Sequence, residues 1–460
     1  MAESRFSTLN LKDELLRNLA SLGYHDMTPI QAASLPAMLS GKDVVAQAKT
    51  GSGKTAAFGL GLLQKLDVAR FRVQSLVLCP TRELADQVAN EIRRLARGIH
   101  NIKVLALCGG TPIGPQLGSL EHGAHIVIGT PGRIDDHLRK GSLKPEDLTT
   151  LVLDEADRML DMGFGPAVEA IIKRLPRKRQ TLLFSATYPD GIRAMVGHVM
   201  KSPEIVSIDS AHDSDTIMQY LCQVADDADR LDVIRCLLLA YRPDSALVFC
   251  NTRRDVQSVA ESIRRAGFVV GALHGELDQR EREQTLVRFA NKSTTVLVAT
   301  DVAARGLDVD DVQTVINYQI ARDTEVHVHR IGRTARAGKQ GIAVSLFEDK
   351  EIRKVEALEA MAGHAIETLP LLPENLDKQT SYKPPMVTLQ IEGGRKQKIR
   401  PGDVLGALTS TGSITRDDVG KIHVFEQCVY VGVKRARARD AIDTLSTGKL
   451  KGRAVRVRQI

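Results

Sequence analysis

The sequence of 460 residues predicts an α/β protein with two similar parallel-sheet domains in tandem and a small α+β domain after them. Short apolar runs of strand length recur between residues 43 and 208, and a second series of such runs begins at residue 246. Strands buried on both faces have this continuous apolar character, which is typical of parallel sheets covered by helices. Beyond residue 386 the predicted order of elements becomes βαββαβ.

The apolar runs and the segments between them give the expected strands and domain bounds. Strands are predicted in the first domain at 43–45, 76–79, 126–128, 151–153 and 181–184, and in the second at 246–250, 296–299, 312–316 and 342–346. The polar segment 210–215 and the proline-rich segment 369–385 predict linkers. The domains are therefore expected at 1–209, 215–364 and 386–460, with a linker at 365–385.

The small domain is expected to have an RNA-recognition-type fold. Its predicted strands are 387–391, 424–425, 429–433 and 455–458, and its predicted helices are 401–408 and 436–445. This order matches the split βαβ arrangement of RNA-recognition domains. Charge supports the same expectation, because residues 386–460 carry 15 Lys and Arg against 7 Asp and Glu, a net charge of +8 in a chain whose total is +7. A positive charge concentrated in one segment indicates a polyanion partner.

Composition argues against membrane, secreted and zinc-binding classes. No apolar run approaches the roughly 18 residues of a membrane span, and the first residues lack a secretion signal. The six cysteines show no paired CxxC spacing. We therefore expect a cytoplasmic protein without a metal cluster and without a membrane partner.

A glycine-rich segment, residues 46–55, lies between the first predicted strand and an apolar run at helical spacing. Backbone N–H groups of such a turn, together with the helix N-terminus, can surround a phosphate. The spacing predicts that Lys54 reaches the β- and γ-phosphates of ATP and that Thr55 ligates Mg²⁺. The other predicted nucleotide contacts are Ala48, Lys49, Thr50, Gly51, Ser52 and Gly53. Alanine stands where the pattern has its first glycine, so the loop alone also fits a turn that binds nothing.

A second half-site follows the predicted strand 151–153, where Asp154 and Glu155 are adjacent. The carboxyl ends of parallel strands are where ligands bind in such sheets. Asp154 is predicted to hold Mg²⁺ through water, and Glu155 to orient and deprotonate the attacking water. The alternative is a solvated acidic strand end that binds nothing. The carboxylate pair and the loop at Lys54 together make a nucleotide site the better interpretation.

Asp154-Glu155-Ala156-Asp157 is the signature of the DEAD-box RNA helicases, which the sequence resembles from residue 6 to about residue 362. The resemblance implies two RecA-like domains and an RNA-stimulated ATPase that uses ATP and Mg²⁺ and separates short duplexes. Residues 27–31 resemble the adenine-recognition motif, in which Gln31 binds the adenine edge and Tyr24 or Phe6 stacks on the base.

The remaining family motifs occur in order along both domains. The RNA contacts that they imply are Pro80, Thr81, Arg82, Gly110, Thr130, Arg133, Thr252 and Thr300. Ser185 and Thr187 are implied to couple the nucleotide state to strand separation, and Gly306 and Asp308 to contact ATP. Arg333 and Arg336 are implied to reach the γ-phosphate from the opposite domain, so that closure completes the site. Ala335 stands where most family members have glycine.

The C-terminal segment resembles the bacterial DbpA branch of this family at residues 393–403, 420–422 and 451–453. This resemblance implies recognition of a hairpin in large-subunit (23S) ribosomal RNA and a role on pre-ribosomal particles during ribosome assembly. The strand around Tyr430 lacks the usual pair of base-stacking aromatics, so recognition is predicted to depend on loops and basic residues. The residues expected to bind RNA there are Arg395, Lys396, Lys398 and Arg400.

Other functions fit the same motifs. One is a general helicase acting on messenger RNA, and another is an ATP-gated RNA clamp or scaffold that does not need unwinding. For the tail, a basic anchor that holds any RNA is the alternative to hairpin recognition.

Overall fold

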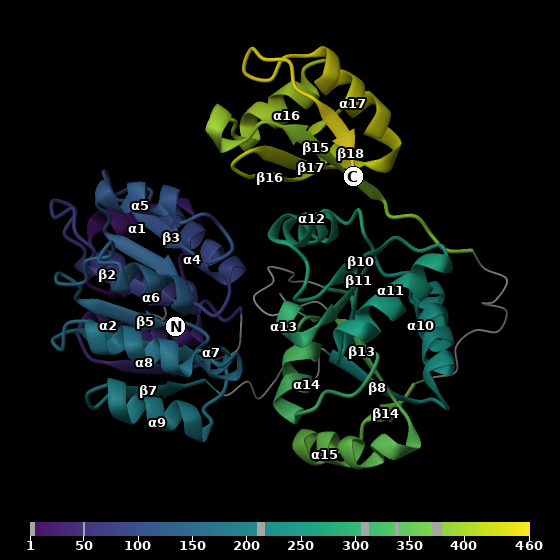
Figure 1. The fold of residues 1–460 in the computed structure, drawn as a ribbon, viewed down its shortest axis with the longest axis horizontal. Helices are drawn as coiled ribbons and strands as arrows, with labels where there is room; N and C mark the ends of the chain where they lie inside the picture. The colour runs from purple at the N-terminus through teal and green to yellow at the C-terminus, as the bar shows by residue number, and fades with distance from the viewer. Residues whose placement is uncertain (1–4, 49–50, 209–216, 305–311, 336–339, 370–379) are drawn as a thin grey trace. The chain divides into compact units, whose positions relative to one another are not determined.

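The computed structural model describes residues 5–48, 51–208, 217–304, 312–335, 340–369 and 380–460. The chain forms two compact units, Met1–Ala211 and His212–Ile460. Each unit is considered by itself below, and Figure 1 gives the labels of the helices and strands. No described helix combines the length and the apolar character that crossing a membrane would require.

The described residues of the first unit form a seven-stranded sheet in the order β3-β4-β2-β5-β6-β1-β7. All of its neighbouring pairs are parallel, as the continuous apolar runs predict. The strands are β1 (Val44–Gln47), β2 (Ser75–Leu78), β3 (Val104–Leu107), β4 (Ile126–Gly129), β5 (Thr150–Leu153), β6 (Gln180–Ser185) and β7 (Glu204–Ser207). Helices on both faces connect them.

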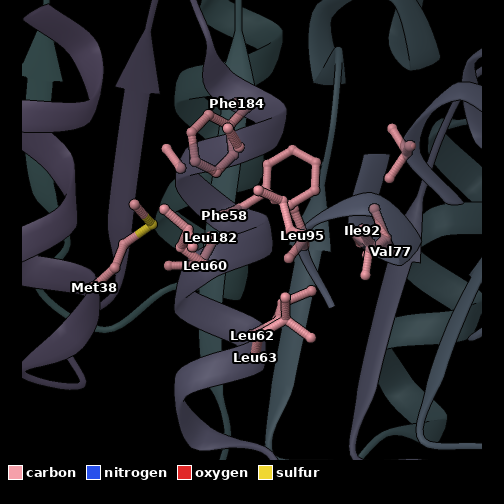
Figure 2. Packing of buried hydrophobic residues seen from close by; sticks show 14 of the residues in the cluster. Met38, Phe58, Leu60, Leu62, Leu63, Val77, Ile92, Leu95, Leu182 and Phe184 are labelled. Carbon is pink, nitrogen blue, oxygen red and sulfur yellow. The ribbon is translucent and has the colours of Figure 1, made fainter. Parts of the chain in front are cut away.

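Two hydrophobic clusters of the first unit cover the two faces of this sheet. Successive residues of β1 enter different clusters, because Val44 and Ala46 belong to one and Val45 to the other. Figure 2 shows part of the first cluster, in which the rings of Phe58 and Phe184 pack with their centroids 5.1 Å apart. The helices are α1 (Asp13–Ser21), α2 (Pro29–Leu39), α3 (Lys54–Lys65), α4 (Arg82–Leu95), α5 (Gly114–Glu121), α6 (Pro131–Arg139), α7 (Ala156–Asp161), α8 (Gly165–Arg174) and α9 (Asp190–Val199).

The second unit contains a similar parallel sheet, whose described strands follow the order β10-β11-β9-β12-β13-β8-β14. The strands are β8 (Ile217–Gln223), β9 (Ala246–Cys250), β10 (Val270–Leu273), β11 (Val296–Thr300), β12 (Thr314–Asn317), β13 (Gly341–Phe347) and β14 (Glu367–Thr368). The helices are α10 (Asp227–Tyr241), α11 (Arg253–Arg265), α12 (Gln279–Ala290), α13 (Asp301–Ala304), α14 (Thr324–Ile331) and α15 (Ile352–Ala362). Two sheets of one type in tandem confirm the predicted α/β class.

The rest of the second unit is the small domain, which has the predicted βαββαβ order and an antiparallel sheet arranged β16-β17-β15-β18. Its elements are β15 (Met386–Glu392), α16 (Pro401–Thr409), β16 (Val419–Val424), β17 (Cys428–Lys434), α17 (Ala438–Thr447) and β18 (Val457–Gln459). The strand expected at 424–425 is instead 419–424. It lies at the edge of the sheet, where polar residues alternate with apolar ones and a register shift interrupts the pairing.

A polar contact joins the small domain to the preceding sheet within the second unit. The Thr388 hydroxyl on β15 lies 2.6 Å from Ser293 Oγ and accepts a hydrogen bond from Asn291 Nδ2 at 3.2 Å. All three residues are buried. Side chains of hydroxyl and amide type therefore make this contact.

Candidate ATP site and nucleic-acid surfaces

In the first unit, the residues predicted to bind ATP follow strands that are neighbours in the sheet. The glycine-rich loop follows β1, Ser185 ends β6, and Asp154 follows β5. These strands are direct neighbours in the order β5-β6-β1, and all are parallel. Their carboxyl ends therefore meet at the same edge, within two strand spacings of roughly 4.8 Å each.

The described part of the glycine-rich loop has a backbone that favours glycine. Gly51 and Gly53 have φ of 84° and 93°, and Gly53 is the residue before α3. A Cβ on Gly53 would lie 2.5 Å from Gln31 Nε2. Lys54 begins α3, and its buried ammonium donates a hydrogen bond to the Ala48 carbonyl at 2.7 Å. Lys49 and Thr50, which were also predicted to contact the nucleotide, lie outside the described residues.

The predicted adenine motif contacts the same loop. Gln31 Oε1 accepts a hydrogen bond from the backbone N–H of Thr28 (2.8 Å), and its Nε2 donates to the Gly53 carbonyl (3.0 Å). Of the two predicted stacking rings, Phe6 is only 3% exposed and belongs to the hydrophobic core. Tyr24 is half-buried and packs under the guanidinium of Arg94. The amide therefore couples the adenine motif directly to the phosphate loop.

Asp154 lies buried directly after β5, where its Oδ1 accepts a hydrogen bond from the Glu155 N–H at 3.1 Å. Burial raises the pKa of its carboxyl to about 7, whereas attraction to Lys54 acts in the opposite direction. A nearby cation stabilises the charged form of a carboxylate that has so little hydration. Mg²⁺ is such a cation, and it prefers oxygen ligands. Asp154, together with the Thr55 hydroxyl in the first turn of α3, therefore fits a Mg²⁺ site.

Glu155 has a strained backbone and a buried cationic neighbour. Its φ of 51° and ψ of 53° place it in the left-handed region, which costs a residue other than glycine about 1 kcal/mol or more. Its Oε2 lies 3.2 Å from Arg158 Nη1, and the two side chains are only 7% and 3% exposed. The guanidinium of Arg158 thus lies beside the Glu155 carboxylate as its cationic neighbour in this buried position.

The last aspartate of the signature binds the segment after β6. Asp157 Oδ2 accepts hydrogen bonds from the N–H groups of Ala186 (3.1 Å) and Thr187 (3.0 Å) and from the Thr187 hydroxyl (3.1 Å). In return the Asp157 N–H donates to Ser185 Oγ at 3.3 Å. The predicted coupling residues Ser185 and Thr187 are thus linked to the start of α7, directly after the predicted catalytic carboxylates Asp154 and Glu155.

The predicted RNA contacts of the first unit gather at the other part of the same edge. Thr81 follows β2, Gly110 follows β3 and Thr130 follows β4, and these strands are neighbours in the order β3-β4-β2. Thr81 caps α4 by accepting a hydrogen bond from Leu84 N–H at 3.2 Å. Pro80 is buried beside it, and Arg82 is half-buried in the first turn of α4. Along this edge, the residues predicted to bind ATP and the residues predicted to bind RNA therefore follow different strands of the sheet.

In the second unit, a buried arginine joins three of the predicted motifs. Arg330 donates to Asp301 Oδ1 (2.6 Å), to Asn251 Oδ1 (2.6 Å) and to the Gln319 carbonyl (2.7 Å). These bonds fix the carboxyl ends of β9 and β11. The two predicted RNA contacts lie at these ends, because Thr252 follows β9 and Thr300 is the last residue of β11.

The predicted arginine-finger segment is described in part. Arg333 is 4% exposed and follows α14. Ala335 has a φ of 56°, so the position where most family members carry glycine is one that glycine adopts without strain. Arg336, Gly306 and Asp308 lie outside the described residues.

The basic residues predicted to bind RNA in the small domain lie between β15 and α16. Lys396 and Lys398 are exposed, as are Arg395 and Arg400. Beside this loop is a cavity of about 460 Å³, lined by Glu392, Gly393, Gln397, Ile399, Leu450, Lys451 and residues 453–456. Ile399 and Leu450 are buried, whereas Arg453 and Arg456 are exposed. Apolar and cationic groups thus meet at one concave surface.

Sequence reasoning did not single out Arg158, Gln116 or Arg330 and gave Asp157 no separate role. Asp157 and Arg330 lie inside recognised motifs, so their motif membership was an available signal. Gln116 had no such signal, because its importance depends on partners that only the folded chain brings near it. Arg158 lies three residues after Glu155, a spacing that the sequence already shows.

Comparison with known proteins decides the family. The chain is 52% identical over 454 residues to the ATP-dependent RNA helicase DbpA of Escherichia coli (strain K12), covering 98% of this chain and 99% of that protein. The chain belongs to the DEAD-box ATP-dependent RNA helicases. It is also 35% identical over 474 residues to the DbpA helicase of Bacillus subtilis (strain 168), with 99% of each chain covered. These relatives place it in the DbpA branch, as the tail predicts.

Domain and structure comparisons agree with this assignment. The DEAD/DEAH box helicase family matches residues 28–195, the helicase conserved C-terminal domain matches 229–338, and the DbpA RNA binding domain matches 388–459. A solved structure of S. cerevisiae Dbp5 bound to RNA and ADP BeF3 resembles this helicase with a TM-score of 0.72 and 28% identity, covering 79% of this chain and 95% of that chain. The helicase is thus a hydrolase that uses ATP and binds RNA, and its two parallel sheets are RecA-like.

Proposed function

We propose that this helicase locally unwinds or remodels large-subunit (23S) ribosomal RNA during ribosome assembly, on pre-ribosomal particles in the cytoplasm. The small domain, residues 386–460, brings it to a ribosomal RNA hairpin, while residues 1–209 and 215–364 act as the two helicase domains. The observation that carries this proposal is the match of residues 388–459 to the DbpA RNA binding domain, in the segment that holds the excess positive charge.

In the proposed reaction, the first domain binds ATP and prepares the attacking water. Lys54 and the loop backbone hold the phosphates, and Gln31 binds the adenine, with Phe6 or Tyr24 against its ring. Thr55 and Asp154 would hold Mg²⁺, which when bound neutralises charge on the phosphate oxygens. Glu155 accepts a proton from the water.

The second domain completes the proposed site on closure. Arg333 and Arg336 stabilise the charge that develops on the γ-phosphate, and Gly306 and Asp308 contact the nucleotide. RNA bound by both domains favours the closed state, in which one strand is held by its backbone and bent. Hydrolysis and product release then return the open state. The family assignment and the buried Arg330 network beside these motifs support this proposal.

The small domain supports hairpin recognition through its cavity. An unpaired nucleobase can contact the half-buried side chain of Val455, while the phosphates contact the exposed guanidinium groups of Arg453 and Arg456. The four basic residues between β15 and α16 extend this charged surface. A nonspecific anchor needs only the charge, whereas a cavity of this size offers contacts to an unpaired base.

The test is RNA-stimulated ATPase of the full chain, measured with the ribosomal hairpin fragment and with a scrambled fragment at two salt concentrations. We expect a lower half-saturating concentration for the ribosomal fragment, and a rise in that concentration with salt because phosphate contacts release counterions. Replacing Arg395, Lys396 and Lys398 by alanine should weaken the ribosomal fragment more than the scrambled one. Arg439→Ala, at an exposed arginine on α17 outside the loop between β15 and α16, is the matched control.

The outcomes separate the alternatives. Equal stimulation by both fragments contradicts hairpin recognition and leaves a nonspecific anchor. Equal or stronger stimulation by messenger RNA hairpins indicates a general helicase. ATP-dependent retention of RNA without displacement of a short strand indicates a clamp.

A further inference from the structure

One glutamine connects the two loops that carry predicted RNA contacts in the first unit. Gln116 lies in the first turn of α5, after the loop that follows β3. Its Nε2 donates to the Cys108 carbonyl and to Thr111 Oγ1, both at 3.0 Å. Its Oε1 accepts from Arg133 Nη1 at 2.9 Å and lies 3.0 Å from His137 Nε2. The first pair of partners belongs to the loop after β3, and the second pair belongs to α6.

These four contacts use the whole hydrogen-bonding capacity of the amide. A glutamine side chain has two N–H donors and two acceptor lone pairs, and each has one partner here. His137 is fully buried, and burial lowers the pKa of its imidazole, which keeps the ring neutral. Its Nε2 must then carry the proton, because it faces an acceptor oxygen, while its Nδ1 lies 2.8 Å from Ser142 Oγ. The amide orientation is therefore fixed from both sides.

Arg133 takes part in the same arrangement. Its Nη2 donates to the Thr111 carbonyl at 2.9 Å, in addition to the bond from Nη1 to Gln116. The guanidinium thus ties α6 to the loop after β3 twice, once directly and once through the amide. Gly110 lies in that loop with a φ of 77°, and Thr130 precedes α6. The backbone N–H of Gly109 approaches Thr130 Oγ1 at 3.5 Å.

We infer that Gln116 is a positioning residue for RNA binding, because it fixes the loop of Gly110 relative to Thr130 so that both contact one RNA backbone. The inference rests on the proposed RNA role of this edge of the sheet. It also assigns Arg133 an internal role, since two of its five N–H donors hold the loop. Gln116 contributes no group to the ATP part of the edge, which lies beyond β2 in the strand order.

The test compares Gln116→Met and Gln116→Glu in the full chain. Methionine has a similar volume and removes all four bonds, whereas glutamate keeps the acceptor toward Arg133 and loses both donors toward Cys108 and Thr111. Ser119→Ala, on the same helix, is the control, because its hydroxyl binds only the Pro115 carbonyl there. The measurements are the RNA concentration that half-saturates the ATPase, the KM for ATP and the thermal unfolding temperature.

Gln116→Met should raise the half-saturating RNA concentration about tenfold, the change that corresponds to about 1.4 kcal/mol. The KM for ATP should stay within about twofold, and Gln116→Glu should show a smaller rise in the same direction. A folded Gln116→Met protein with unchanged RNA half-saturation would overturn the inference. If the methionine variant does not fold, Gln116→Glu decides by the same criterion.

Arg82→Ala separates this inference from the proposed RNA role of the edge. Arg82 is proposed to contact RNA directly and begins α4, whereas Gln116 lies in α5. If Arg82→Ala and both Gln116 variants all leave RNA half-saturation unchanged, the edge does not bind RNA and the proposed role is wrong as well. If only the Gln116 variants leave it unchanged, the RNA role stands and the positioning role is wrong.

Discussion

Replacing Asp157 by asparagine should weaken the link between ATP hydrolysis and strand separation. One carboxylate oxygen of Asp157 accepts three hydrogen bonds from Ala186 and Thr187, and the other accepts one from the Arg158 N–H at 2.9 Å. Asparagine keeps one acceptor oxygen and places an NH₂ group against the remaining donors. Whichever way its amide is turned, at least one N–H donor is left facing another donor.

The magnitude follows from these bonds. A hydrogen bond to a charged acceptor contributes about 1.5–3 kcal/mol and one to a neutral acceptor about 1 kcal/mol. Losing one charged bond outright and weakening the other three therefore costs at least about 3 kcal/mol in total. A cost of this size changes the equilibrium between the linked and unlinked arrangements by a factor of about 100.

The assay follows ATP turnover and displacement of a short RNA strand in the same reaction. Asp157→Asn should displace at least about tenfold fewer strands per ATP hydrolysed, and its urea midpoint should fall. Thr187→Val, which removes only the hydroxyl bond, should show a smaller effect of the same kind. Glu169→Gln, at an exposed position on α8, controls for the loss of one charge. Wild-type stability together with wild-type displacement per ATP in Asp157→Asn would refute the reasoning.

Three further predictions concern the two active-site halves and the second unit. Arg333→Ala should lower ATP turnover by about 10³-fold or more, because an arginine finger acts on the transition state, whereas Arg353→Ala on α15 should not; equal rates in a steady-state ATPase assay would remove Arg333 from the site. Burial lowers the pKa of His327 to about 4, so below about pH 6.5 the unfolded chain binds more protons than the folded one and stability falls as the pH decreases to 4, by up to about 3 kcal/mol. His327→Gln should reduce the difference between urea unfolding at pH 7 and at pH 5, and an unchanged difference would contradict the buried neutral ring. Ala335→Gly should stabilise the folded chain by about 1 kcal/mol, because it relieves the left-handed backbone, and should therefore raise the unfolding temperature with ATP turnover unchanged. A lower unfolding temperature would show that the backbone there is not strained.

The central strands were predictable because they are buried on both faces. Leu76–Leu78 and Leu151–Leu153 are fully buried and form continuous apolar runs, which the sequence shows directly. The edge strand β7 (Glu204–Ser207) shows this signal weakly, because only two of its residues are apolar and only Val206 is buried. The strands β3, β10 and β14 also lie at sheet edges, whereas β8 lies inside its sheet, and none of the four was predicted, although β3 (Val104–Leu107) is apolar throughout.

The site was predictable to the extent that its residues belong to contiguous motifs. Lys54, Asp154 and Glu155 follow strands that the apolar pattern locates, and parallel strands bring them to one edge. The partners of these residues were not predictable, because they depend on side-chain packing across the fold. Gln31 against Gly53 is an example, and so is the internal use of Arg133.

The hydroxyl and amide contact at Asn291, Ser293 and Thr388 has a consequence for how such helicases diversify. When a domain that attaches through apolar side chains is removed, it leaves an exposed hydrophobic surface that promotes aggregation. At this contact the side chains uncovered by removal would be a carboxamide and a hydroxyl, which water solvates readily. A helicase core of this kind can lose its C-terminal reader, or receive a different one by gene fusion, without first rebuilding its own surface. The targeting of the enzyme and its motor can therefore change separately over evolutionary time.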